Sequence, residues 1–145
     1  MILTLTIECI WGAYLKEECI RVIEIDEEAS LYDLHDAIQD AVNFGRDHPF
    51  EFFLANTSSP HSAKKWLTEK EKWEDKEDDF LRIRLIDIWP AGRKKLYYLF
   101  DFGDKWNFEI RKKRGSKEPE PEVTYPRLIK AIGPNPEQYP RWEDK

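Results

Sequence analysis

Asp101 and Asp104 are the residues of this chain whose types and spacing most readily suggest chemistry. The two carboxylates stand three positions apart around Gly103, with aromatic stretches on both sides of the turn. Such a pair can hold a hard cation, or divide acid and base roles where its environment separates the two pKa values. A structural role accounts for the same residues, because aspartates at turns accept hydrogen bonds from backbone N–H groups two or three residues on.

Two histidines and a tyrosine are the other candidates for such a site. Folding could bring His35 or His48 next to the aspartate pair, which is the arrangement that a metal-assisted hydrolase would need. Tyr97 could offer an exposed aromatic face to a ligand or peptide. His35 also fits a core histidine that bonds a backbone carbonyl or a carboxylate, because it lies on the apolar stripe of a predicted helix. The three histidines lack the spacing of a two-histidine metal pair, and we predict no cofactor.

The turn must be held by two strands, and the flanking residues predict them. Alternation indicates strands over residues 95–100 and 106–112, each with one apolar face. These faces consist of Leu96, Tyr98, Phe100, Trp106, Phe108 and Ile110. Pairing the two strands as an antiparallel hairpin would stack aromatic rings across the ladder. We expect Gly103 to supply the positive φ of the turn, and we expect Trp106 to be buried.

The first half of the chain predicts the order strand, strand, helix, strand. Residues 2–10 and 19–25 alternate like half-buried strands and are expected to form an antiparallel hairpin with a long connection. A helical stripe follows over residues 31–42, and residues 50–54 form the next strand. We therefore predict an α+β fold with a β-grasp-like opening, in which one main helix packs on one face of a mostly antiparallel sheet.

The predicted helix has recognisable caps at both ends. Ser30 is a favoured N-cap residue, and Asp33 three positions on gives an acidic version of the capping box. Gly45, which follows Asn43 and Phe44, suits a left-handed exit from the helix. We expect the apolar stripe of this helix to face the sheet.

A charged excursion is predicted at about residues 56–79 of what we expect to be a single domain over residues 1–145. A helix within the excursion could place Trp66 and Trp73, which are one heptad apart, on a single face. Exposed tryptophans favour interfaces, so this region could serve a protein partner.

The end of the chain is less regular. Alternation predicts a strand over residues 80–85, and residues 123–125 are expected to form an edge strand. Pro126 near the start of residues 126–132 favours a short helix there. A polar tail begins at about residue 134.

Charge limits the classes of partner. The 145-residue chain has a formal net charge of −6, which argues against non-specific nucleic-acid binding, because that binding neutralises phosphates with basic surface. Basic residues cluster at residues 111–117, which we expect to be a solvated hairpin end. The sequence shows no membrane span and no signal-peptide pattern, and Cys9 and Cys19 are expected to stay reduced. We therefore predict a cytoplasmic protein.

Three motifs carry a family resemblance: a Leu-x-x-Leu-His-x-x-Ile-Gln helix, a His-x-x-x-Phe strand and a Tyr-x-Tyr/Phe-Asp-Phe-Gly-Asp-x-Trp hairpin. They are Leu31, Leu34, His35, Ile38 and Gln39; His48 and Phe52; and Tyr98, Phe100, Asp101, Phe102, Gly103, Asp104 and Trp106. With these motifs and Arg21, which matches an arginine of the second strand, the chain resembles the plasmid pRiA4b ORF-3-like family. The resemblance implies an α+β domain and no settled biochemical activity.

We expect a small, non-catalytic binding or interaction module. The chain is rich in aromatic and turn features but contains no Walker loop, Rossmann fingerprint, nucleophile elbow or zinc knuckle. One alternative is a metal-assisted hydrolase or other enzyme that uses Asp101 and Asp104 with His35 or His48. Another is a nucleic-acid-associated accessory protein of mobile elements that uses residues 111–117.

Overall fold

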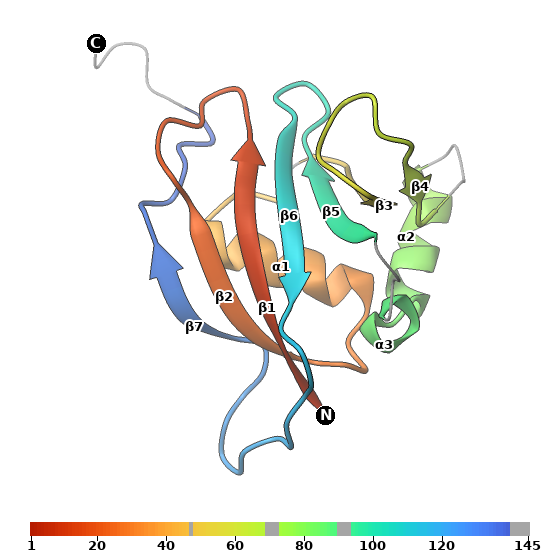
Figure 1. Cartoon of the computed structure of the whole chain (residues 1–145), viewed down its shortest axis with the longest axis vertical. Helices are drawn as coiled ribbons and strands as arrows, with labels where there is room; N and C mark the ends of the chain where they lie inside the picture. The colour runs from red at the N-terminus through yellow and green to blue at the C-terminus, as the bar shows by residue number, and fades with distance from the viewer. Residues whose placement is uncertain (47, 69–72, 90–93, 140–145) are drawn as a thin grey trace.

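The chain folds into an antiparallel sheet with its longest helix packed against one face, as the computed structural model shows (Figure 1). Residues 1–46, 48–68, 73–89 and 94–139 are described. Within them the strands are β1 (Ile2–Trp11), β2 (Ile20–Asp26), β3 (Phe50–Ala55), β4 (Lys65–Trp66), β5 (Lys95–Phe100), β6 (Trp106–Lys112) and β7 (Arg127–Ile132). The helices are α1 (Leu31–Val42), α2 (Trp73–Arg82) and α3 (Leu85–Ile88).

The order of the strands across the sheet is β4-β3-β5-β6-β1-β2-β7, and each of these pairings is antiparallel. The predicted α+β class with a mostly antiparallel sheet is therefore confirmed, whereas the β-grasp-like opening stays a prediction. The β1–β2 hairpin is also confirmed. Its alternation buries Leu5, Ile7 and Cys9 against α1, as period-two patterning requires of a half-buried strand.

The caps of α1 are confirmed at its start and corrected at its end. The Ser30 hydroxyl accepts the N–H of Asp33, and the Asp33 carboxylate accepts the N–H of Ser30. The left-handed residue is Asn43 at φ 59°, and not Gly45 as predicted. Asparagine tolerates this conformation because its short polar side chain can bond locally, and Gly45 instead donates its N–H to Gln138.

The β5–β6 hairpin has the predicted register, with Phe100 opposite Trp106. Trp106 is fully buried, as predicted. The positive φ angles of the turn belong to Asp101 (60°) and Lys105 (52°), so the prediction that Gly103 supplies one is wrong. The Asp101 carboxylate accepts the N–H of Gly103 at 3.1 Å, and this local bond stabilises a left-handed aspartate.

Residues 80–85 end α2 and begin α3, so the strand predicted there is wrong. Phe80 is fully buried and stacks on Phe50 with ring centroids 4.6 Å apart, and Leu85 is fully buried from α3. Period-two alternation over six residues cannot distinguish a strand from two short helices that each bury one residue.

Trp66 lies in β4 and Trp73 begins α2, so the prediction that one helix face carries both is wrong. Trp66 packs on Phe53 with ring centroids 5.0 Å apart and stays 38% exposed. Strand pairing with β3 outweighs the helical spacing of the two tryptophans because it buries part of the Trp66 ring against the sheet.

β7 lies where a short helix was predicted over residues 126–132, and residues 123–125, which were predicted to be an edge strand, belong to no strand. It pairs with the outer edge of β2, and Arg127 forms an ion pair with Glu24 across that pairing, with Nε and Oε1 2.5 Å apart. Residues of β7 form a strand because they pair with β2, which is distant in the sequence. The preference of proline for the start of a helix therefore predicted the wrong element.

Candidate functional site

The β5–β6 turn, the β1–β2 connection, the segment before β3 and the C-terminal segment meet at one end of the sheet (upper end in Figure 1). Contacts between these connections include the N–H of Ala13 with the carbonyl of Asp104 at 3.0 Å. Gly45 N–H likewise donates to Oε1 of Gln138 at 2.8 Å. The side chains gathered here, which we call the loop cluster, are His48, Asp101, Asp104, Gln138 and Tyr139.

His48 links the aspartate turn to the C-terminal segment. Its Nε2 lies 2.7 Å from the hydroxyl oxygen of Tyr139 and 3.4 Å from Oδ2 of Asp101. Asp101 is buried, and its other oxygen accepts the N–H groups of Gly103 and Asp104. One carboxylate therefore holds the turn and contacts the histidine at the same time, which combines the structural interpretation with a possible acid–base pair.

The two aspartates interact electrostatically. Partial burial raises the pKa of the Asp104 carboxyl, the charge of Asp101 raises it further, and His48 opposes the shift. In the described ranges, no group of three or more His, Cys, Asp or Glu side chains has an arrangement that could hold a metal ion. The hydrolase hypothesis stays a prediction, and the structure places His48 beside its aspartates.

His35 lies in a separate, buried network. Its Nδ1 is 2.5 Å from the hydroxyl oxygen of Tyr98, which also accepts a bond from Nε2 of Gln39 at 3.0 Å. With Gln39 as donor, the tyrosine donates its proton to an unprotonated Nδ1. Burial lowers the pKa of His35 to about 3. His35 is thus a core histidine, and its partner is a hydroxyl group in place of the predicted carbonyl or carboxylate.

Tyr97 has no exposed face for a ligand, so that expectation is wrong. Its side chain is fully buried on the sheet face away from α1, stacked on Phe53 with centroids 5.1 Å apart. Its hydroxyl donates to Glu109 at 3.4 Å. Burial and the neighbouring carboxylate together raise the pKa of Tyr97 to about 12.

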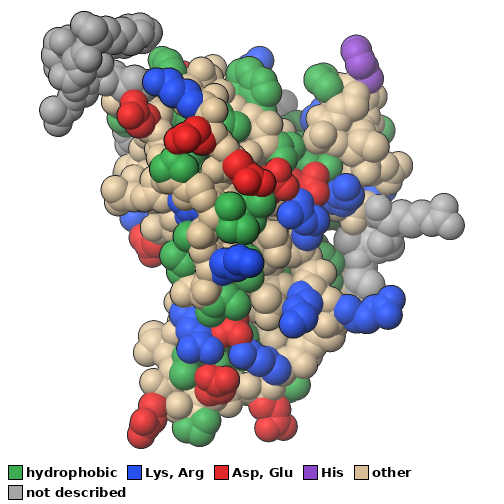
Figure 2. Space-filling view, turned by 60° about the vertical axis from the view of Figure 1, so that its left-hand side comes forward, with side chains coloured by type: hydrophobic (Ala, Val, Ile, Leu, Met, Phe, Trp, Pro, Cys, Tyr) green, Lys and Arg blue, Asp and Glu red, His purple; other side chains and the backbone are tan. Residues whose placement is uncertain are grey.

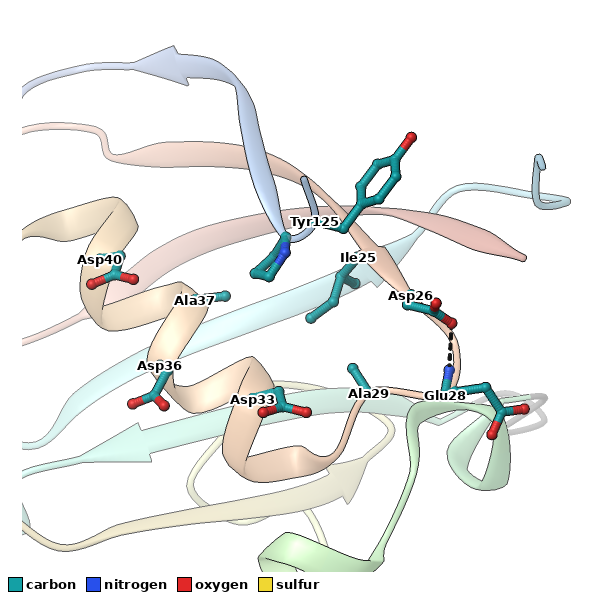
Figure 3. A pocket seen from close by; sticks show the side chains of 10 residues that line it. Ile25, Asp26, Glu28, Ala29, Asp33, Asp36, Ala37, Asp40 and Tyr125 are labelled. Atoms are coloured by element: carbon teal, nitrogen blue, oxygen red, sulfur yellow. Dashed lines mark hydrogen bonds between the residues drawn. The ribbon is translucent and has the colours of Figure 1, made fainter. Parts of the chain in front are cut away.

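A groove that sequence reasoning missed lies between α1 and the segment that enters β7 (Figure 3). Its volume is ≈ 510 Å³. Five carboxylates line it: Asp26, Glu28, Asp33, Asp36 and Asp40. The remaining lining consists of Ile25, Ala29, Ala37, Tyr125 and Pro126. We call this feature the acidic groove.

The acidic groove keeps a net negative charge when the arginines that pair with its carboxylates are counted. Arg46 pairs with Asp36 and Asp40 from outside the lining, and Arg84 pairs with Glu28 at 3.4 Å. Two arginines against five carboxylates leave a net charge of −3, and Asp26 and Asp33 have no partner cation among the described residues. Because Lys and Arg are absent from the ten lining residues, the groove attracts cationic groups.

The groove continues along β7 in a smaller cavity of ≈ 110 Å³. The two cavities share Ala37, Asp40 and Pro126, and the smaller one adds Ile23, Ala41, Arg127 and Leu128. The sequence indicated one wall of the groove, since Asp33, Asp36 and Asp40 have the spacing of one helix side. The opposite wall could not be found because residues 126–132 were predicted to be helical.

The basic run at residues 111–117 is partly paired within the fold. Arg111 lies 3.0 Å from a carboxylate oxygen of both Glu8 and Glu109, and Lys117 pairs with Glu24. Within the described parts of the chain, Lys113 and Arg114 have no acidic partner in ion-pair range. The nucleic-acid hypothesis stays a prediction.

Comparisons with known proteins give relatives without an assigned activity. Uncharacterized protein y4hQ of Sinorhizobium fredii (strain NBRC 101917 / NGR234) is 29% identical over 101 residues, covering 69% of this chain and 47% of the relative. The chain thus spans about half the length of that relative. No helix in the described ranges is both long enough and apolar enough to cross a membrane.

The crystal structure of a protein of unknown function, MM3350 from Methanosarcina mazei Go1, shares the fold with a TM-score of 0.63 and 22% identity. The match covers 90% of this chain and 68% of that chain. The sequence pattern described as plasmid pRiA4b ORF-3-like protein matches residues 10–138, which is most of the chain. The chain therefore belongs to the plasmid pRiA4b ORF-3-like family.

Proposed function

We propose that this protein is a non-catalytic interaction module that binds a cationic segment of a partner protein in the acidic groove. The observation that carries the proposal is the composition of the groove, which combines five carboxylates with an apolar floor and lacks Lys and Arg. Lysine and arginine side chains match such a lining, because their methylene stems pack on apolar surface while their charged heads reach carboxylates.

The size of the groove supports this proposal. Its ≈ 510 Å³ falls in the range of roughly 300–1,000 Å³ that is usual for ligand sites. The carboxylates of Asp36 and Asp40 are well exposed, with side-chain exposures of 43% and 70%. Their attraction is therefore screened by salt, and it contributes to selection and association rate more than to affinity. Affinity comes from the apolar lining residues that remain accessible, Ala29, Tyr125 and Pro126.

We also propose a β-grasp-like opening and a cytoplasmic location for this module. The chain order β1, β2, α1, β3, with α1 across the sheet, fits the β-grasp-like opening. Cys9 and Cys19 are free and buried, and unpaired thiols suit a reducing compartment such as the cytoplasm.

The test is fluorescence anisotropy with a labelled eight-residue peptide of alternating lysine and threonine. The double variant Asp36→Lys/Asp40→Lys reverses charge in the groove. Glu17→Lys/Glu18→Lys is the matched control, since it changes net charge equally on the exposed β1–β2 connection. We expect at least about a tenfold loss of affinity in the groove variant only, equivalent to about 1.4 kcal/mol.

Equal losses in both double variants would mean that the probe responds to net charge alone. Circular dichroism melts of each variant show whether the fold survives the substitutions. Absence of binding to the unmodified protein at low salt would remove the proposal.

A further inference from the structure

We infer that the partner segment binds as an added antiparallel strand on the outer edge of β7, with every second side chain entering the acidic groove. This inference rests on the proposed function and adds the binding mode and the kind of partner: an extended peptide with cationic residues at alternate positions. The observations behind it are the position of β7 in the sheet, its exposed side chains and its continuity with the groove.

β7 is the last strand of the sheet, and among the described residues only β2 pairs with it. The bond from the Cys9 N–H to the Cys19 carbonyl fixes the alternation of the ladder, so that Ile20 and Val22 direct their backbone groups toward β7. Ala131 lies between their partners on β7. Its N–H and C=O therefore point away from β2, where an incoming strand could bond them.

The outer edge of β7 is apolar and uncovered. Leu128, Ile129 and Ile132 are 49%, 47% and 37% exposed. Figure 2, with the β7 side turned forward, shows apolar side chains exposed among charged ones on this face. Edge strands that avoid association are typically short, charged or covered. Of the two cations on β7, Arg127 is already paired with Glu24, which leaves Lys130 as the charge that protects this edge.

The edge and the groove form one continuous surface. Leu128 pairs with Ile23, whose side chain is buried on the α1 side of the sheet, so Leu128 faces α1. Leu128 also lines the smaller cavity with Asp40 and Ala41. Side chains on one face of an added strand recur about every 6–7 Å, and those on the α1 side enter between α1 and β7. There they meet Asp36 and Asp40.

Charge selects a cationic partner strand over a second copy of this chain. Two copies joined edge to edge through β7 would bring two acidic grooves together, and each copy has a formal net charge of −6. A strand with alternating lysines instead supplies the charge that the groove lacks.

The experiment compares three forms of the lysine–threonine peptide: unmodified, N-methylated at every lysine, and N-methylated at every threonine. All three carry the same charges, but each methylated form loses the N–H donors along one strand edge. An added strand bonds through one edge only. We expect one methylated form to bind as the unmodified peptide does and the other to bind at least about tenfold more weakly.

A variant of the protein gives the second measurement. Ala131→Pro removes an N–H that points away from β2, and proline is tolerated on edge strands. We expect Ala131→Pro to lower the affinity for the unmodified peptide about tenfold, whereas Ala131→Val leaves that affinity within about twofold.

Equal binding of all three peptides would overturn strand addition and leave the proposed function standing. Binding of none would overturn both. A peptide-free dimer in size-exclusion chromatography that Ala131→Pro dissociates would assign the edge to a second copy and overturn the inference.

Discussion

At the scale of single residues, Gly12 and Trp106 form one packing unit beneath the loop cluster. A Cβ built at Gly12 would lie 2.0 Å from Cε3 of the Trp106 ring. Trp106 is fully buried, and its Nε1 has no hydrogen-bond partner in the described structure. Sequence alternation predicted the burial of Trp106, but no local pattern predicts that Gly12 contacts a residue so distant in the sequence.

Gly12→Ala is expected to destabilise the protein by about 1–3 kcal/mol, because the buried ring cannot move aside without disturbing its neighbours. Urea unfolding at pH 7 measures the effect. Gly103→Ala is the control, since a Cβ there would make only an ordinary contact of 3.4 Å with Asp101. A cost for Gly12→Ala no larger than that of Gly103→Ala would contradict the packing described here.

The buried imidazole of His35 predicts a pH dependence of stability. Its pKa is lowered from 6.5 to about 3 in the folded protein, so below pH 6.5 the unfolded chain binds a proton that the folded protein does not. The contribution of neutral His35 to the free energy of unfolding is fully present above pH 6.5 and is lost progressively as the pH falls toward 3. Between pH 7 and pH 5 the loss is about 2 kcal/mol.

Urea unfolding of His35→Gln at both pH values isolates that contribution. Glutamine keeps an acceptor near the Tyr98 hydroxyl but does not titrate. We expect the fall in unfolding free energy between pH 7 and pH 5 to be smaller in the variant than in the unmodified protein. Equal falls in the two proteins would show that His35 does not titrate as its burial requires.

At the scale of elements, Arg21 connects the end of α1 to β7 and the segment beyond it. The guanidinium group is buried and donates to the carbonyls of Ala41, Ile20 and Ile132 and to Oδ1 of Asn135. A cation also suits the negative end of the helix dipole at Ala41. The same side chain therefore helps to set the distance between α1 and β7, which line the smaller cavity that continues the acidic groove.

Arg21→Met should cost about 2–3 kcal/mol, because it leaves several carbonyl oxygens without their charged donor. Arg82→Met is the matched control: its guanidinium is 70% exposed and pairs with Asp79, and exposed pairs contribute only about 0–1 kcal/mol. Thermal unfolding followed by circular dichroism compares the two. Equal effects would show that Arg21 does not tie the elements together.

Elements with strong local patterns were predicted well, and those that depend on distant partners were not. α1 carries its cap and its stripe in its own residues, and β5 and β6 carry their alternation and turn. β7 has one exposed edge and few buried side chains, so its strand character comes from β2. The same limit applies to candidate sites: His48 and Asp101 belong to motifs, but their contact arises from the fold.

At the scale of the whole molecule, the chemically suggestive residues divide between two places. The loop cluster holds His48 and Asp101 at the end of the sheet, while the acidic groove lies along α1 and β7. The loop cluster joins several connections through side-chain bonds, so its residues are accounted for by structural roles. The acidic groove has charges and apolar surface that internal bonds do not fully use, which is why we assign binding to it.

The most direct test of that assignment is an NMR titration of the isotopically labelled protein with the unmodified lysine–threonine peptide. Binding in the acidic groove predicts amide shift changes concentrated at Ala37, Ala41 and Leu128 and spreading along β7. It also predicts little change at Thr6 on the opposite sheet face. Changes concentrated at the loop cluster, or spread evenly over acidic surface without a maximum along α1 and β7, would contradict the account.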